Sequence, residues 1–587
     1  METQKTILFA ALFFLSYVMW QSWHQTFPDK YSSQPNSEKL IITTNSHDSS
    51  LVPSVVNNVQ NNTNSNVNNA NINDDKLITV KTDVIEYKIN LVGGDIVQTS
   101  LLEFKKVLTE DLPMTLLNYN RETLYTAANG LTGTNGPDTQ DSRAVYTSDK
   151  NNYELSPESS DLVVNLILTD SANSDIKITK SFIFKRGQYD MDVVYNIDNN
   201  TSKNWSGNIF SVLKRKNVPS ESSSFLSPSS YSGLAVYDQE NKFRKLPSDK
   251  LLNTPQNWAT KEGWAATIQH YFLSAWIPSK NENYKYIAKA NNDDTYTVTL
   301  VGPEIVLSPG QKTTTEAMKF YSGPEQADKL DKLAVGLNRT VDYGIMWPIA
   351  SIIFLAMKAI HSVVGNWGWA IILVTILIKL LFYRLSSSSY RSMAKLRILA
   401  PKIEQLRSKC GDDKEKMGKA MMELYKKEKV NPLGGCLPML IQLPFFIALY
   451  WVIIESVELR HAPFGLWIQD LSVKDPYFIL PIIMGLAMLG QQRLSPAPAD
   501  PTQAKVMMMM PVMFTVLFIY FPAGLVLYWV VNTITSIMQQ WWISRKIDLD
   551  KNSPNSSSSK KKDYKSDKLD IKKLAFKSKP INDSSYS

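Results

Sequence analysis

One charged side chain, Lys379, stands inside a long apolar run of the sequence, from Trp367 to Tyr383. A run of this length and composition predicts a helix that crosses a lipid bilayer. An ammonium group inside such a helix costs about 2.5–3.5 kcal/mol, because the hydrocarbon core has no water to solvate it. The side chain must therefore either extend to the nearer headgroups or face a water-filled cavity between helices. In the second case it provides a positive charge that can attract acidic groups.

Other polar residues in the apolar runs favour a cavity between the helices. Thr375 precedes Lys379 by four residues, so the two share one helix face. A polar stripe also marks the last apolar run, at Asn532, Thr535, Ser536 and Gln539. Lipid would leave such side chains unsatisfied, so they are expected to face one another across the bundle. The predicted hydrophilic groove comprises Lys379, Thr375, Gln442, Asn532 and Ser536.

A plainer interpretation of the same residues remains open. Arg384 follows Lys379 by five residues, which is about 7–8 Å along a helix. Lys379 could therefore reach the cytoplasmic headgroups beside it. The serine and threonine hydroxyls could instead bond to carbonyls of their own helix. Periodicity alone does not separate the two interpretations.

The apolar residues are clustered, mostly after position 344, although mean hydropathy over the 587 residues is only -0.19. This contrast predicts a soluble part joined to a membrane part, with a helical bundle of six spans. The six runs are Ile7–Trp20, Trp367–Tyr383, Leu437–Ile454, Tyr477–Gly490, Val506–Phe521 and Ala523–Trp542.

Charge predicts the orientation of these spans. The segment Arg384–Lys429 contains 13 Lys and Arg against 6 Asp and Glu, and the tail from Arg545 is also basic. Basic loops mark the cytoplasmic side, so both termini are expected there and residues 24–344 outside. The first run lacks a small-residue cleavage site and is followed by Trp20 and Trp23. We expect an uncleaved signal anchor over residues 1–23, the alternative being a cleaved signal peptide.

The external region divides into two parts by composition. Residues 24–75 are rich in Asn and Ser and predict a disordered linker. Residues 76–344 predict a large β-sandwich, since apolar and polar residues alternate over Tyr189–Asp198 and turn signals recur at Ser171–Ser174 and Gly93-Gly94. No metal-ligand spacing or phosphate loop is present, and Cys410 and Cys436 lie far apart without a nearby histidine. Neither a metal nor a cofactor is expected.

The membrane half contains two further features. Residues 345–361 predict an amphipathic helix at the outer interface, because a further span there would place the basic loop outside. Within the core, residues 362–544, we expect a cytoplasmic helical hairpin at residues 385–430, with two amphipathic helices that bury their apolar stripes on each other. Residues 545–587 form a basic cytoplasmic tail. The outward basic residues of the hairpin include Arg391, Lys395, Arg397 and Lys402.

The membrane half contains a series of recognisable strings, which include Asn431-Pro-Leu-Gly-Gly-Cys-Leu-Pro438, Ile441-Gln-Leu-Pro444, Ser456-Val-Glu-Leu-Arg460, Phe521-Pro-Ala-Gly-Leu-Val-Leu-Tyr528 and Tyr390-Arg-Ser-Met-Ala-Lys395. Together these strings resemble the YidC family of membrane protein insertases. In the external part the most recognisable stretch is Gly130-Leu-Thr-Gly-Thr-Asn-Gly-Pro-Asp138.

The resemblance implies an insertase and chaperone of the bacterial inner membrane, without enzymatic activity. The family's groove cation falls on Lys379, where the best-known members carry arginine; lysine keeps the charge but lacks the bidentate fork. Substrate helices are expected to slide past an apolar surface, and the basic hairpin is expected to recruit them. The residues of that surface are Leu440, Pro444, Phe446, Phe514, Leu517, Tyr528 and Trp529.

The implied partners are nascent membrane proteins, the Sec translocon, the ribosome, the signal recognition particle receptor and membrane lipids, with no small-molecule substrate. Two other classes of function would require residues of different types. A solute channel or transporter would require intramembrane carboxylates or paired broken helices, and the apolar runs contain neither Asp nor Glu. A membrane-anchored carbohydrate enzyme would require paired carboxylates in the external sandwich.

Overall fold

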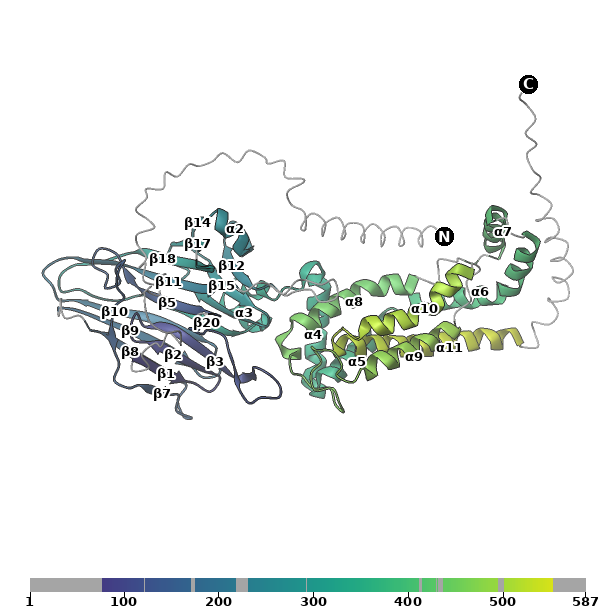
Figure 1. The fold of residues 1–587 in the computed structure, drawn as a ribbon, viewed down its shortest axis with the longest axis horizontal. Coiled ribbons are helices and arrows are strands. Elements are labelled where there is room, and N and C mark those ends of the chain that lie inside the picture. The colour runs from purple at the N-terminus through teal and green to yellow at the C-terminus, as the bar shows by residue number, and fades with distance from the viewer. Residues whose placement is uncertain are drawn as a thin grey trace, which may run out of the picture. The chain divides into compact units, whose positions relative to one another are not determined.

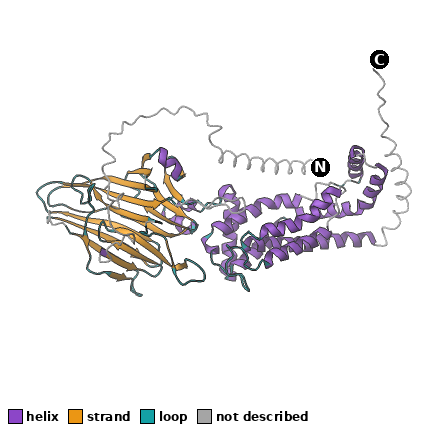
Figure 2. Cartoon of the chain, in the orientation of Figure 1, coloured by secondary structure: helices purple, strands orange, loops and turns teal. Residues whose placement is uncertain are grey.

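The computed structural model describes residues 76–120, 122–169, 175–217, 231–291, 293–410, 414–428, 430, 437–494 and 501–552. The described residues up to Asp342, together with Glu455–Val457, form a β-rich unit, and the other described residues from Tyr343 onward form a helical unit (Figure 1). Figure 2 shows the strands gathered in the first unit and the long helices in the second. The predicted signal anchor, linker and most of the basic tail lie outside the described residues.

The β-rich unit contains two large sheets, as the sequence predicted. In order across the first sheet, the strands are β14 (Gln256–Thr260), β17 (Tyr284–Ala290), β18 (Thr295–Leu307), β11 (Trp205–Lys216), β5 (Tyr125–Thr132), β3 (Asp95–Lys105), β2 (Ile85–Asn90), β1 (Leu77–Lys81) and β7 (Asn152–Glu154), with β4 (Pro113–Thr115) on β3. In the second they are β13 (Lys242–Leu246), β12 (Gly233–Asp238), β15 (Trp264–Gln269), β16 (Phe272–Ile277), β20 (Met318–Pro324), β10 (Asp190–Asn199), β9 (Ile176–Lys185), β8 (Asp161–Leu168) and β6 (Tyr146–Thr147), with β19 (Lys312–Thr314) on β10. Apart from the parallel pair of β1 and β7, the described pairings are antiparallel.

The two sheets pack face to face. The Tyr125 hydroxyl of the first sheet donates to the carbonyl of Thr267 in the second, and the Trp276 indole donates to the carbonyl of Val212. The alternation predicted for Tyr189–Asp198 is confirmed in β10, where every second side chain is buried. The predicted hairpin turn at 171–174 lies outside the described residues, but β8 and β9 on either side of it are antiparallel neighbours.

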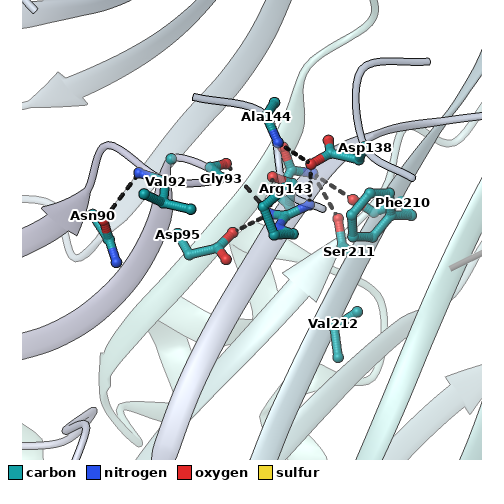
Figure 3. A network of polar contacts seen from close by, with 12 residues as sticks. Asn90, Val92, Gly93, Asp95, Asp138, Arg143, Ala144, Phe210, Ser211 and Val212 are labelled. Carbon is teal, nitrogen blue, oxygen red and sulfur yellow. Dashed lines mark hydrogen bonds and ion pairs between the residues drawn. The ribbon is translucent and has the colours of Figure 1, made fainter. Parts of the chain in front are cut away.

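A buried charge network lies in this sandwich, near the turn between β2 and β3 (Figure 3). Arg143 donates to carboxylate oxygens of Asp95 and Asp138, and both Arg143 and Asp138 are buried. Asp138 also accepts from the amides of Leu131 and Ala144, at 2.9 and 3.0 Å. Gly130 is required beside it, because an added Cβ would lie 2.3 Å from Asp138 Oδ2. The recognisable stretch Gly130–Asp138 therefore has a structural role, which is to hold one guanidinium in the core.

Lys180 lies against the same network. Its ammonium donates to the carbonyls of Gly93, Gly94 and Asn129, at 3.1, 2.9 and 2.7 Å. The predicted turn at the two glycines is confirmed, since both have the left-handed φ values, 83° and 61°, that glycine adopts without strain. Burial lowers the pKa of Lys180 to about 7.

We expect the β-rich unit to become more stable as the pH rises from about 7 to about 9. In this window the buried Lys180 has lost its proton, whereas an unfolded lysine keeps it until about pH 10.4, so unfolding takes up a proton. The slope is at most about 1.4 kcal/mol per pH unit. Urea unfolding of the full chain in detergent, followed by the sheet signal in circular dichroism, measures it. Lys180→Met should flatten this pH dependence, and an unchanged slope in that variant would exclude Lys180 as its source.

The long helices of the second unit correspond to the predicted apolar runs and the hairpin. They are α4 (Trp347–Val364), α5 (Trp367–Leu381), α6 (Tyr383–Cys410), α7 (Lys414–Lys427), α8 (Leu437–Glu455), α9 (Ile479–Leu494), α10 (Pro501–Phe518) and α11 (Ala523–Asn552). The short helices α2 (Ser248–Asn253) and α3 (Ala327–Leu333) belong to the β-rich unit. The predicted turn between the last two apolar runs is confirmed, but it covers residues 519–522, and Ala523 and Gly524 of the predicted turn already belong to α11. Helix α11 continues past the predicted boundary at residue 544, since no glycine or proline interrupts the polar stretch that follows.

Length and hydropathy identify fewer spans among the described helices than the six predicted. The segment Gly344–Val364 is long and apolar enough to cross a membrane, and the pair Trp367–Leu381 with Tyr383–Leu406, bent by 69°, would add a second if counted as one span. Three further apolar helices, Ile441–Glu455, Ile479–Leu494 and Lys505–Phe518, are shorter. The interfacial position of residues 345–361 stays a prediction, because the length of α4 permits either placement.

Candidate functional site: a hydrophilic groove and an aromatic surface

Lys379 lies on the inward face of α5. The helix begins after Asn366, whose side chain accepts a hydrogen bond from the amide of Trp369, and its buried residues recur at steps of three and four. Lys379 shares this face with Ile371 and Thr375, and only 8% of its surface is exposed. The apolar pattern of α5 therefore places the cation between helices.

Two neutral side chains from other helices hold the ammonium. Lys379 Nζ donates to Gln442 Oε1 of α8 at 3.1 Å and to Ser536 Oγ of α11 at 2.7 Å. Ser536 in turn donates to the carbonyl of Asn532 at 2.7 Å. No carboxylate among the described residues forms an ion pair with Lys379. The positive charge is thus solvated by dipoles but not neutralised, and it remains able to attract an anion.

The other predicted groove residues have different roles. Thr375 is buried beside Lys379, but its hydroxyl donates to the carbonyl of Ile371 at 2.6 Å, so it bonds within its own helix. Asn532 is half-buried on α11 and takes part through its backbone carbonyl. The structure therefore brings together Lys379, Gln442 and Ser536 by side-chain bonds, with Asn532 and Thr375 adjacent.

Sequence reasoning missed a group of polar residues at the start of α6. Tyr390 is buried and hydrogen-bonds to Ser536, which links the first turns of α6 to the residue that holds Lys379. The buried serines of this segment are Ser386, Ser387 and Ser389. The run of four serines before Tyr390 could have revealed them. The sharp bend between α5 and α6, which turns them inward, could not be read from the sequence.

An aromatic cluster joins α8, α10 and α11. Phe446 lies 4.8 Å from Trp529 in an edge-on contact and 6.2 Å from Tyr528, measured between ring centroids. Phe514 stacks on Trp529 at 6.4 Å. Phe518, which sequence reasoning missed, is buried and contacts several of these rings.

Two of the predicted slide residues, Phe446 and Phe514, both contact a third, Trp529, and these three rings are called the aromatic surface here. Pro444 and Leu517 are half-buried in α8 and α10. Tyr528 is almost fully buried, because its ring faces inward against Phe446, so it supports this surface without being exposed on it. The side chain of Leu440 lies outside the described residues.

The hairpin has the predicted two-helix form. Helices α6 and α7 contact each other and bury Leu399, Leu406 and Leu424. Three of the predicted basic residues, Arg391, Lys395 and Arg397, are exposed. Lys402 is half-buried and pairs with Glu428 of the facing region at 3.0 Å. No cluster of His, Cys, Asp or Glu suited to a metal ion occurs in the part of the chain that the structure describes.

The close packing of α9 against α10 depends on one glycine. Gly485 of α9 faces Thr515 of α10, and an added Cβ would lie 2.2 Å from Thr515 Oγ1. That hydroxyl is fixed by a 2.7 Å bond to the carbonyl of Pro511, so it cannot move aside cheaply. The two helices can pack this closely only with glycine at position 485.

We expect Gly485→Ala to destabilise the helical unit by about 1–3 kcal/mol, the usual range for overpacking. Adding Thr515→Ala should restore most of the loss, since the added Cβ would then meet the Cβ of residue 515 at 3.4 Å, an ordinary contact. Thermal unfolding of the four proteins of this double-mutant cycle in detergent measures the coupling. A double variant no more stable than Gly485→Ala would show that the close contact does not govern the packing.

The comparisons with known proteins cover both units. Residues 359–551 match the family model of the 60Kd inner membrane protein, and residues 77–356 match that of the YidC periplasmic domain. The chain is 46% identical over 565 residues to the membrane protein insertase YidC of Pseudomonas putida (strain GB-1), covering 93% of this chain and 99% of that protein. The chain belongs to the YidC family of membrane protein insertases.

Other members of the YidC family are similarly close. The insertase of Pseudomonas fluorescens (strain SBW25) is 44% identical over 557 residues, again with 93% and 99% of the two chains covered. Among solved structures, an active YidC insertase crystallised with its first transmembrane domain resolved shares 20% identity, with a TM-score of 0.38 and coverage of 79% of this chain and 92% of that one.

Membership of the YidC family assigns the two units. The β-rich unit is the periplasmic domain and the helical unit is the core in the inner membrane. The chain is an insertase and not an enzyme, and its substrates are nascent membrane proteins.

Proposed function

We propose that this insertase moves the short external tail of a substrate through the hydrophilic groove, with Lys379 as the site that attracts its acidic residues. The support is that the ammonium is held between α5, α8 and α11 by Gln442 and Ser536, with no carboxylate partner among the described residues. Two opposite charges about 4 Å apart attract by about 4 kcal/mol at an effective dielectric constant of about 20. Part of this is offset by desolvation, so the capture is transient.

The apolar part of the substrate follows a different path. As the tail crosses, the substrate helix moves along the aromatic surface of Phe446, Phe514 and Trp529 into lipid. Burial of its apolar side chains in lipid provides the driving force, so no nucleotide is needed. Met508, Met509 and Met513 of α10 are exposed, and flexible thioether side chains can adapt to many substrate sequences.

The proposed topology follows from charge. Both termini and the hairpin lie in the cytoplasm, where the positive-inside rule places their basic residues. The exposed Arg391, Lys395 and Arg397 form a basic surface that meets a nascent chain as it leaves the ribosome. The ribosome, the signal recognition particle receptor and the Sec translocon are the proposed protein partners, and the basic tail contacts anionic lipid.

Site-specific photocrosslinking tests the proposed path. A photoreactive amino acid at Phe514 is expected to crosslink the apolar segment of a stalled nascent membrane protein. The matched control is Leu377 of α5, an exposed leucine outside the aromatic surface, which should give at most background crosslinking. Equal crosslinking from both positions would contradict a defined slide, and crosslinking from neither would contradict passage along this face.

A further inference from the structure

The loop between α8 and α9, residues 456–478, is tied firmly to the outer ends of the bundle helices. The amides of Ala523 and Gly524, at the start of α11, donate to the carbonyls of Val473 and Leu471 at 2.7 and 2.9 Å. Asp475 is buried and accepts from the amide of Leu480 in α9 at 2.7 Å. The base of the loop is therefore fixed to both α9 and α11.

The tip of this loop, residues 463–467, lies beside the first turn of α5. Asn366 Nδ2 donates to the carbonyls of Pro463 and Phe464, both at 3.1 Å. The Phe464 ring packs so closely on Gly368 that an added Cβ there would lie 2.1 Å from Phe464 Cδ2. It also meets Trp369 edge-on, with ring centroids 5.9 Å apart. The tip is thus at the level of the end of a helix in the membrane core.

Leu466 is held outward at this tip. It is 87% exposed, more than any other large apolar side chain among the described residues, and its φ of 54° is one that leucine rarely adopts. Between His461 and Asp470 the sequence contains no charged residue. Asp470 itself is buried and bonds to the amide and hydroxyl of Ser472. A leucine exposed on an uncharged tip is unfavourable in water and favourable in lipid.

We propose that this tip is an anchor in the outer leaflet, with Leu466 inserted at the boundary between headgroups and acyl chains. The exposed ring of Trp369, which contacts Phe464 of the tip, suits the same level, since amphipathic aromatic side chains concentrate at membrane interfaces. Lipid is the partner because the tip continues the lipid-facing surface of α5. The anchor fixes the depth of the loop and, through its bonded base, that of α9 and α11.

A fluorescent probe at position 466 tests this anchor. Leu466→Cys, in full-length protein carrying Cys410→Ser and Cys436→Ser, is labelled with an environment-sensitive dye and reconstituted in phosphatidylethanolamine–phosphatidylglycerol vesicles. The matched control is Leu252→Cys, an exposed leucine on α2 of the periplasmic domain. We expect blue-shifted emission at position 466, quenching by doxyl-labelled lipid at least twofold stronger than at position 252, and weaker quenching by aqueous iodide.

Two outcomes would overturn the proposal. Iodide quenching at position 466 equal to that at position 252 would place the tip in water. Protection from both quenchers would mean that protein covers it, from this chain, a second copy or another partner. If the labelled variant fails to fold, the unsubstituted protein can be reacted with a photoactivatable lipid. The peptide containing Leu466 should then be modified, and its absence among the modified peptides would equally overturn the anchor.

Discussion

Lys379→Glu is expected to reduce insertion of a substrate with an acidic external tail by at least about tenfold, which corresponds to about 1.4 kcal/mol. Reversal of the charge replaces attraction of the tail by repulsion. A carboxylate also cannot donate to Gln442 Oε1 as the ammonium does. A substrate of the same apolar sequence with a neutral tail should be affected less. Protection of the translocated tail from protease in vesicles measures both.

Two control variants separate charge from packing. Lys379→Arg keeps the charge and should change insertion very little, because the neutral oxygens of Gln442 and Ser536 can accept hydrogen bonds from a guanidinium as well as from an ammonium. Lys379→Met keeps much of the side-chain volume but removes the charge. It should also reduce insertion of the substrate with an acidic tail, but less than Lys379→Glu does. If Lys379→Glu impaired acidic and neutral tails equally, charge capture would not be the role of this residue.

Arg143→Ala is expected to destabilise the periplasmic domain by about 3–5 kcal/mol. The substitution leaves the carboxylate of Asp138 buried without its partner, and that is where most of the loss arises. Urea unfolding of the full chain in detergent, followed by the sheet signal in circular dichroism, gives the change in free energy. Arg186→Ala is the matched control, because Arg186 bonds to backbone carbonyls in an exposed setting; it should cost less than about 1.5 kcal/mol.

Removal of both buried partners tests the cause. Arg143→Met combined with Asp138→Leu eliminates the uncompensated charge and should recover part of the loss. A single Arg143→Ala variant that loses less than about 1 kcal/mol would contradict the structural role assigned to the stretch Gly130–Asp138.

The contact between Lys379 and the polar stripe of the last apolar run was one of the two interpretations that spacing allowed. Residues four apart on a helix share a face, and the bond from Lys379 to Ser536 joins the two helices. The role of Thr375 could not be predicted, since a threonine hydroxyl can bond to its own helix or across to another. Tyr390 was missed because its approach to Ser536 depends on the 69° bend between two helices.

In the periplasmic domain, too, some features could be predicted from the sequence and others could not. Strict alternation predicted β10, because a strand with one buried face has a period of two. The network of Asp95, Asp138, Arg143 and Lys180 could not be predicted, because its members come from separate segments and only the pairing of the strands brings them together. A local pattern in the sequence indicates whether a helix or a strand forms, whereas contacts between distant segments depend on the topology of the fold.

Water access to the groove tests the central claim most directly. Gln442→Cys, on α8, places a thiol next to the Lys379 ammonium. Leu377→Cys, on the exposed face of α5, is the lipid-facing control. Both are made in the Cys410→Ser, Cys436→Ser background and treated with a water-soluble maleimide in inside-out vesicles. A hydrated groove predicts labelling at position 442 at least about tenfold faster than at position 377, since only a hydrated thiol ionises and reacts. Equally slow labelling at both positions would show that water does not reach the cation and would contradict the proposed route for substrate tails.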